Sequence, residues 1–240
     1  MASRIVDLIP AHTHYGEVFA GAGWVFFNKP ESRHESLNDL NSDLVAFYRV
    51  LQNHLEEFCR QFRWLISSRE LFNDWNRQLA AGGLTDIQKA AKFYYLQRQA
   101  FGGKLTGRTF GTCSAKAPRI NLLRLEEELS EVHLRLARVV IEHLPWQEYV
   151  SRYDSPSTFF YADPPYWGFE DFYGKGMFAR QDFAALAAHL AAIKGKFILS
   201  INDVPAIRST FAAFNMRTVK TIYCNKKVAP EVQELLISNF

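Results

Sequence analysis

The sequence predicts an α/β domain that is built on a largely parallel sheet and interrupted by a helical insertion. Short strand-like runs alternate with helical patterns toward both ends of the chain, the middle lacks such runs, and 48% of the 240 residues are hydrophobic. Strands that alternate with helices form a parallel sheet covered on both faces. This composition excludes a disordered or fibrous protein, and no apolar run approaches the roughly 20 residues that a membrane helix needs.

The first elements are predicted from apolar periodicity and from the glycines and prolines that interrupt it. In chain order they are a helix over residues 5–9 that stops at Pro10, a strand over 15–19, a helix over 24–27, a strand over 35–38 and a helix over 44–62. Strand, glycine turn and helix form the usual opening of an α/β domain.

The same criteria predict five more strands after the middle of the chain. They cover residues 138–142, 158–162, 196–201, 218–223 and 234–238, with a helix over 180–193. Seven strands are therefore expected in total. We expect residues 1–51 and 136–240 to form one domain, and residues 52–135 to form the insertion.

Basic residues are concentrated in the insertion, although the net charge is only +3. Between Lys89 and Leu125 there are eight Lys or Arg residues and no Asp or Glu, interleaved with glycines and with Phe93, Tyr94, Tyr95, Phe101 and Phe110. Cationic side chains neutralise phosphates, and aromatic faces stack on exposed bases. The segment is predicted to bind nucleic acid, with an ordinary solvated basic loop as the alternative.

Two features near the first strands point to a nucleotide-like ligand. Gly21 and Gly23 would let a ligand approach the backbone just before a helix begins. Asp39 is placed where the second strand ends, and a carboxylate there can accept hydrogen bonds from the two hydroxyls of a ribose. A plain turn remains the alternative for the glycines, and a helix N-cap formed by Asp39, Asn41 or Asp43 remains the alternative for the aspartate.

The most specific feature is Asp163-Pro164-Pro165-Tyr166, directly after the predicted strand over residues 158–162. Two prolines force an extended backbone and remove two amide donors, which makes a rigid turn where open α/β sheets bind ligands. An amine there would give its hydrogens to the Asp163 carboxylate and the Pro164 carbonyl, while Tyr166 stacks on the ring. The nitrogen lone pair would then become nucleophilic. A merely stiff turn is the alternative.

The order of these motifs resembles the Dam-type N6-adenine DNA methyltransferases, particularly their phage-encoded branch. The resemblance covers nearly the whole chain and includes residues 95–103, 197–203 and 234–239. It implies a Rossmann-like S-adenosylmethionine-dependent methyltransferase fold, with a seven-stranded mixed sheet whose last strand is antiparallel. It also implies that residues 52–135 are the target-recognition domain, which binds DNA while the methyl group passes directly to N6 of a flipped-out adenine.

The resemblance assigns roles to individual positions. The cofactor-binding residues would be Phe19, Gly21, Gly23, Asp39 and Asn41. The catalytic residues would be Asp163, Pro164, Pro165 and Tyr166. The DNA contacts would come from Arg98, Phe101, Lys104, Arg108 and Trp167. We expect S-adenosylmethionine as cofactor, no metal, double-stranded DNA as partner and no membrane. We also expect a monomer in the bacterial cytoplasm, encoded by a chromosome or a phage.

Two other functions remain open at this point. Residues 1–4 do not contain the Gly-Gly-Lys segment with which such enzymes usually reach the cofactor's carboxylate. We expect that the chain is truncated, that its start is misassigned, or that Arg4 and local amides substitute. This gap leaves open a DNA-binding protein that keeps the fold without turnover. The basic insertion could also hold structured RNA, which favours an RNA adenine methyltransferase. Trp64, Trp75 and Trp146 are expected in a core or a domain contact.

Overall fold

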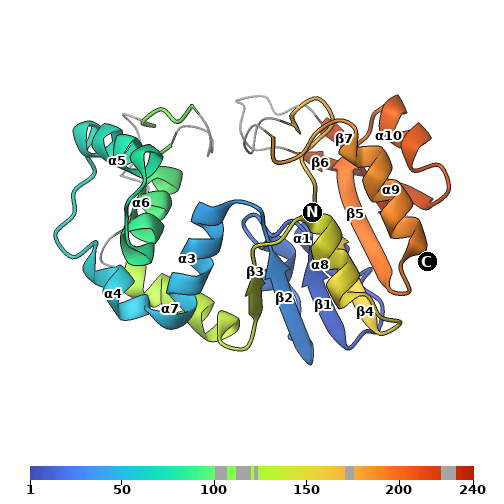
Figure 1. The fold of residues 1–240 in the computed structure, drawn as a ribbon, viewed down its shortest axis with the longest axis horizontal. Helices are drawn as coiled ribbons and strands as arrows, with labels where there is room; N and C mark the ends of the chain where they lie inside the picture. Colours follow the sequence, from blue (N-terminus) through green and yellow to red (C-terminus); the bar gives the residue numbers. More distant parts are fainter. Residues whose placement is uncertain (101–106, 112–119, 122–123, 171–175, 223–230) are drawn as a thin grey trace. The chain divides into compact units, whose positions relative to one another are not determined.

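A single seven-stranded mixed sheet organises the structure, which is a computed structural model (Figure 1). Residues 1–100, 107–111, 120–121, 124–170, 176–222 and 231–240 are described. The strands are β1 (His14–Glu17), β2 (His34–Asn38), β3 (Val140–Glu142), β4 (Thr158–Ala162), β5 (Lys196–Asn202), β6 (Asn215–Ile222) and β7 (Glu231–Ser238).

The strand order in the sheet is β3-β2-β1-β4-β5-β7-β6. β1 pairs in parallel with β2 and with β4, and β4 pairs in parallel with β5. β7 lies between β5 and β6 and is antiparallel to both. The predictions of seven strands and of an antiparallel last strand are therefore confirmed.

The chain divides into two compact units. One unit is formed by residues 1–40 and 142–240, and the other by residues 41–141, a range that contains the predicted insertion. Helices of the first unit are α1 (Ala2–Val6), α2 (Trp24–Asn28), α8 (Trp146–Tyr153), α9 (Asp182–Ala192) and α10 (Pro205–Thr210). Helices of the second unit are α3 (Ser42–Asn53), α4 (Leu55–Arg60), α5 (Arg69–Ala81), α6 (Asp86–Gln99) and α7 (Leu125–Leu136). Among the described residues, no helix has the length and apolar character needed to cross a membrane.

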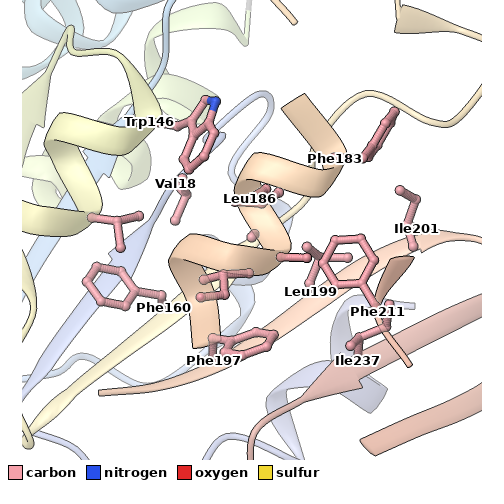
Figure 2. Close-up of a cluster of buried hydrophobic side chains, with 14 of the residues drawn as sticks. Val18, Trp146, Phe160, Phe183, Leu186, Phe197, Leu199, Ile201, Phe211 and Ile237 are labelled. Carbon is pink, nitrogen blue, oxygen red and sulfur yellow. The ribbon is translucent and has the colours of Figure 1, made fainter. Parts of the chain in front are cut away.

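The main core lies between one face of the sheet and helices α8, α9 and α10. Every second residue of β5 points into it, namely Phe197, Leu199 and Ile201, and Figure 2 shows them beside Phe183 and Leu186 of α9. Fully burying a side chain of this size contributes about 1.5–3 kcal/mol. Because side chains alternate along a strand, the residues between them face the opposite side of the sheet.

Gly16 of β1 lies where this core leaves no room for a side chain. A Cβ atom on Gly16 would lie 2.7 Å from the Tyr149 hydroxyl and 3.1 Å from the Phe160 ring. Tyr149 belongs to α8, and its hydroxyl is bonded to Ser36 of β2. Glycine in β1 therefore allows α8 to pack closely against the sheet.

The predicted single helix over residues 44–62 is wrong, because the chain breaks at His54. His54 has φ −140° and ψ 39°, so α3 ends there and α4 begins at Leu55. Along one straight helix, Phe47 and Phe58 would lie about 16 Å apart, at 1.5 Å per residue. The break lets their rings meet at 5.8 Å in the core of this unit.

The expectations for aromatic residues of the insertion need correction. Phe93 and Tyr95 are only 4% and 1% exposed, so they are core residues and not faces on which a base could stack. Trp64, expected in a core or a domain contact, is 87% exposed. It lies in the turns after α4, where the Arg63 guanidinium is 5.4 Å from its ring.

Candidate active site

A left-handed glycine turn joins β1 to α2. Gly21 and Gly23 have φ angles of +49° and +65°, which residues with a Cβ atom rarely adopt. The Gly23 amide donates to the Ala20 carbonyl at 2.8 Å and closes the turn. No atom of the described residues lies within 4 Å of the position that a Cβ atom on Gly21 would occupy, so in this part of the structure the backbone is open to a ligand.

Two carboxylates fix this turn from the ends of neighbouring strands. Glu17 of β1 is buried, and its Oε1 accepts hydrogen bonds from the Tyr15 hydroxyl and the Phe26 amide, both at 2.7 Å. Asp39 follows β2, and its Oδ2 accepts from the Gly21 amide at 3.0 Å. Burial raises the pKa of Glu17 to about 8, against the lowering effect of its hydrogen bonds, and Asp163 raises this pKa further.

The predicted cofactor-binding residues differ in their structural surroundings. Phe19, Gly21, Gly23 and Asp39 follow the ends of β1 and β2, and the Phe19 ring meets Phe178 edge to face at 5.8 Å. The N-cap of α3 is Asn41, whose side chain accepts from the amides of Asp43 and Leu44. Arg4, the suggested substitute for the family's lysine, donates to the carbonyl of Lys220 in β6.

Asp163 is the first residue after β4, and a hydroxyl chain fixes its carboxylate. Ser200 of β5 donates to Asp163 Oδ1 at 2.9 Å, and the Tyr161 hydroxyl lies 2.7 Å from Ser200 Oγ. Ser200 and Tyr161 are buried, whereas Asp163 is exposed to solvent. Hydroxyl groups of the sheet thus hold the Asp163 carboxylate in place, while the residue remains accessible to solvent.

Desolvation raises the pKa of Asp163 to about 7, and the hydrogen bond from Ser200 lowers it. The nearby carboxylate of Glu234 also raises this pKa. Asp163 as a whole residue is exposed to solvent, and the protein atoms around its carboxyl group nonetheless desolvate it. Near neutral pH such a carboxyl group can both hold and release a proton.

The rest of the proline turn is attached to β5 and β7. Pro164 and Pro165 are buried. The Tyr166 hydroxyl donates to Glu234 Oε1 at 2.7 Å, and the Trp167 amide donates to Asn202 Oδ1 at 2.9 Å. The turn is therefore fixed at both its acidic and its aromatic end.

The Trp167 ring packs against Phe183 of α9. The ring centroid lies 5.2 Å from that of Phe183, and the Arg180 guanidinium is 4.9 Å from the indole. The side chain is half-buried, so only part of the indole is available to a substrate.

The predicted DNA contacts of the insertion differ in exposure. Arg98, near the end of α6, is exposed, and its guanidinium lies 5.9 Å from the Tyr94 ring. Arg108 is half-buried at 5.9 Å from the Phe93 ring, and burial lowers its pKa. Phe101 and Lys104 lie outside the described residues.

Four residues of the site were not identified from the sequence: Glu17, Ser200, Asn202 and Glu234. Each lies in a segment that the resemblance covered, but nothing in the local pattern gave it a role. Only Ser200 has a local signal, a polar residue within an apolar strand, as in Leu199-Ser200-Ile201. Among the described residues, no group of three or more His, Cys, Asp or Glu side chains is arranged to hold a metal ion.

This sheet, with its antiparallel strand between the fifth and sixth, is the fold of class I methyltransferases, and the site lies where open α/β sheets bind their ligands. The acidic proline turn after β4 is the feature from which the sequence predicts methylation of an amino group. The chain belongs to the D12 class N6 adenine-specific DNA methyltransferases, whose family model matches residues 1–225. The resemblance found in the sequence is thereby confirmed.

Individual relatives agree with this assignment. The Type II methyltransferase M.CviBI of Paramecium bursaria Chlorella virus NC1A is 23% identical over 214 residues, covering 88% of this chain and 82% of the relative. A DNA adenine methylase of Vibrio cholerae is 28% identical, covering 95% and 87%. The DNA N-6-adenine-methyltransferase of Escherichia phage P1 is 33% identical over a shorter stretch, covering 42% of this chain and 14% of the relative.

Proposed function

We propose that the protein transfers a methyl group from S-adenosylmethionine to N6 of an adenine that is flipped out of duplex DNA at a specific sequence. The observation that carries the proposal is the Asp163 carboxylate, fixed by Ser200 at the carboxyl end of β4. The residues below are assigned roles on that basis.

The residues after β1 and β2 fit S-adenosylmethionine. Phe19, Gly21 and Gly23 would border its methionine part, because the described residues leave the backbone open at Gly21. Asp39 would accept hydrogen bonds from the ribose hydroxyls, and Asn41 would add a polar contact nearby. The bound cofactor supplies an electrophilic methyl group on a positively charged sulfur, and the ionised carboxylate of Asp163 suits a cation.

The Asp163 turn would prepare the adenine amino group. Because Ser200 occupies Oδ1 of Asp163, Oδ2 is the oxygen that would accept one amino hydrogen. The Pro164 carbonyl would accept the other, and Pro165 keeps the turn extended. The two acceptors draw the nitrogen lone pair out of the ring and stabilise the positive charge that grows on N6. With its raised pKa, Asp163 can then take the proton that N6 loses.

Base flipping costs a few kcal/mol of stacking and pairing, which protein contacts must offset. Tyr166 would stack on the flipped adenine, and Trp167 would border it. Residues 41–141 contain 15 Lys or Arg and 10 Asp or Glu, which leaves +5 on this unit and −2 on the rest. We therefore assign DNA binding, through Arg98, Phe101, Lys104 and Arg108, to the insertion of residues 52–135.

Transfer of tritiated methyl groups from S-adenosylmethionine to unmethylated duplex DNA tests the proposal, with structured RNA as competitor. We expect incorporation at adenine N6 of DNA, reduced about 100-fold or more by Asp163→Ala. DNA binding without incorporation would support the non-catalytic alternative, and preference for RNA would support the RNA enzyme. Mapping methylated adenines in DNA from expressing cells would give the recognition sequence.

We also propose that the protein acts as a monomer in the bacterial cytoplasm. The sedimentation coefficient of the DNA complex on a single-site duplex tests the oligomeric state. One protein chain per duplex is expected, and two would contradict it.

A further inference from the structure

Asn202 and Glu234 form a cross-strand pair beside the proline turn. Asn202 is the last residue of β5, and the antiparallel register places it opposite Glu234 of β7. Side chains of directly opposed residues lie on the same face of a sheet, with Cβ atoms about 5 Å apart. Two strands thus offer neighbouring polar groups to one segment of the chain.

These two side chains hold two consecutive residues of the turn. Asn202 is bonded to the Trp167 backbone twice, since Oδ1 accepts from the amide at 2.9 Å and Nδ2 donates to the carbonyl at 3.1 Å. Glu234 Oε1 accepts from the Tyr166 hydroxyl at 2.7 Å. Asn202 therefore fixes the backbone, and Glu234 fixes the direction of the Tyr166 ring.

A carboxylate at position 234 is not what packing alone favours. Glu234 is only 3% exposed, and a buried charge is costly unless it is well hydrogen-bonded. A glutamine would accept the same hydrogen bond from Tyr166 without the charge. The charge also raises the pKa of Asp163, which makes Asp163 harder to ionise. A second negative charge is useful, however, if positive charge develops on a nitrogen nearby.

We propose that Glu234 is a positioning residue for methyl transfer, which directs the Tyr166 ring onto the target adenine and adds a second negative charge beside Asp163. The inference rests on the proposed function, because that function assigns Tyr166 to the adenine. Glu234 touches Tyr166 and acts on the substrate through it.

Several groups face Asp163 and must be separated in any test by pH. Glu17 of β1 and Tyr161 of β4 interact with it electrostatically, as does Glu234, while Ser200 of β5 donates a hydrogen bond. Among these, in the described part of the chain, Glu234 alone is also bonded to the turn's aromatic residue. Glu234→Gln removes the charge and keeps the acceptor, whereas Glu234→Ala removes both.

The test measures methyl transfer to duplex DNA from about pH 5.5 to about pH 9. Glu234→Ala and Tyr166→Phe are each expected to lower kcat about tenfold, the effect of losing a hydrogen bond to a charged group. The double variant should lose no more than Glu234→Ala alone, because Glu234→Ala already removes the hydrogen bond that Tyr166→Phe would remove. Glu234→Gln should keep more of kcat than Glu234→Ala and shift the acid limb of the profile to lower pH.

Gln233→Ala is the matched control, since Gln233 is the exposed neighbour of Glu234 on β7 and should change neither kcat nor the pH profile. Thermal unfolding checks that each variant folds, and the conservative Gln and Phe variants decide the question if the Ala variant does not. This inference alone would be overturned if the wild-type enzyme is active and the kcat losses of the two single variants add up in the double variant. The same holds if the pH profile of Glu234→Gln is not shifted. An inactive wild-type protein would overturn the proposed function with it.

Discussion

Asp163 is subject to opposing influences at the scale of a single residue. Desolvation and the charge of Glu234 favour its neutral form, and the Ser200 hydroxyl favours its charged form. Desolvation and the Glu234 charge outweigh the hydrogen bond from Ser200, so the pKa of Asp163 is about 7 instead of the ordinary 3.8. The proposed chemistry needs the ionised form, because a neutral carboxyl group is a weaker acceptor for an amino hydrogen.

From this we predict that kcat/KM of the free enzyme rises as pH passes through about 7 from below. Asp163→Asn has no carboxyl group to ionise at this position. Its residual activity, which we expect to be reduced about 100-fold or more, should therefore lack this rise with pH. Burial, the largest influence on the pKa of Glu17, is the same in both proteins. Loss of the Asp163 charge lowers that pKa but does not remove the Glu17 titration, so a limb that disappears belongs to Asp163. Parallel profiles for wild type and variant would contradict the assignment.

Gly23 is constrained by its backbone conformation. At φ +65°, an alanine is strained by about 1–2 kcal/mol, so Gly23→Ala should lower the melting temperature and also weaken S-adenosylmethionine binding. Gly82→Ala is the control, because Gly82 has φ +75° but ends α5 in the other unit. Calorimetric titration should show weaker cofactor binding for the first variant and unchanged binding for the second.

At the scale of elements, the contact between β1 and α8 depends on the absence of a side chain at Gly16. We predict that Gly16→Ala lowers the free energy of unfolding by about 1–3 kcal/mol through overpacking against Tyr149. Tyr149→Phe removes the hydroxyl that the new Cβ atom would meet. In chemical denaturation, the double variant should therefore lose less than the sum of the two single losses. Simple additivity would mean that the strain is relieved elsewhere.

Elements defined by local pattern were predictable, and those defined by distant contacts were not. The predicted strand over residues 158–162 has the bounds of β4, because a mostly apolar run of five residues is followed by Asp163 and two prolines. The break at His54 was missed, since it follows from Phe47 meeting Phe58 in space. The expectation for Trp64 was wrong for a related reason. The residues next to an aromatic side chain in the sequence do not show whether it will face the core or the solvent.

The site shows the same division between local and distant information. Asp163, Pro164 and Tyr166 could be proposed from the sequence because they are adjacent. Ser200 and Glu234 could not, because their hydrogen bonds to Asp163 and Tyr166 span 37 and 68 residues. Only the strand order, with β7 inserted between β5 and β6, brings these groups to one edge.

At the scale of the whole molecule, the two units carry charges of opposite sign. The basic unit suits a polyanion, and the acidic unit suits a cationic methyl donor. We predict that Arg98→Ala weakens DNA binding and lowers the slope of log K against log salt concentration by about 1, as expected for the loss of one phosphate contact. Fluorescence anisotropy at several salt concentrations measures this slope. Arg77→Ala, an exposed arginine on α5 outside the predicted contacts, serves as the control and should leave the slope unchanged.

The position of β7 has a consequence for synthesis of the protein. Ribosomes make β5 and β6 first, and the strand that separates them in the sheet emerges after both. Until that strand inserts, Tyr166 lacks its carboxylate partner Glu234. The proline turn is then held by Ser200 and Asn202 of β5. A nascent chain therefore carries an incomplete site until β7 has joined the sheet.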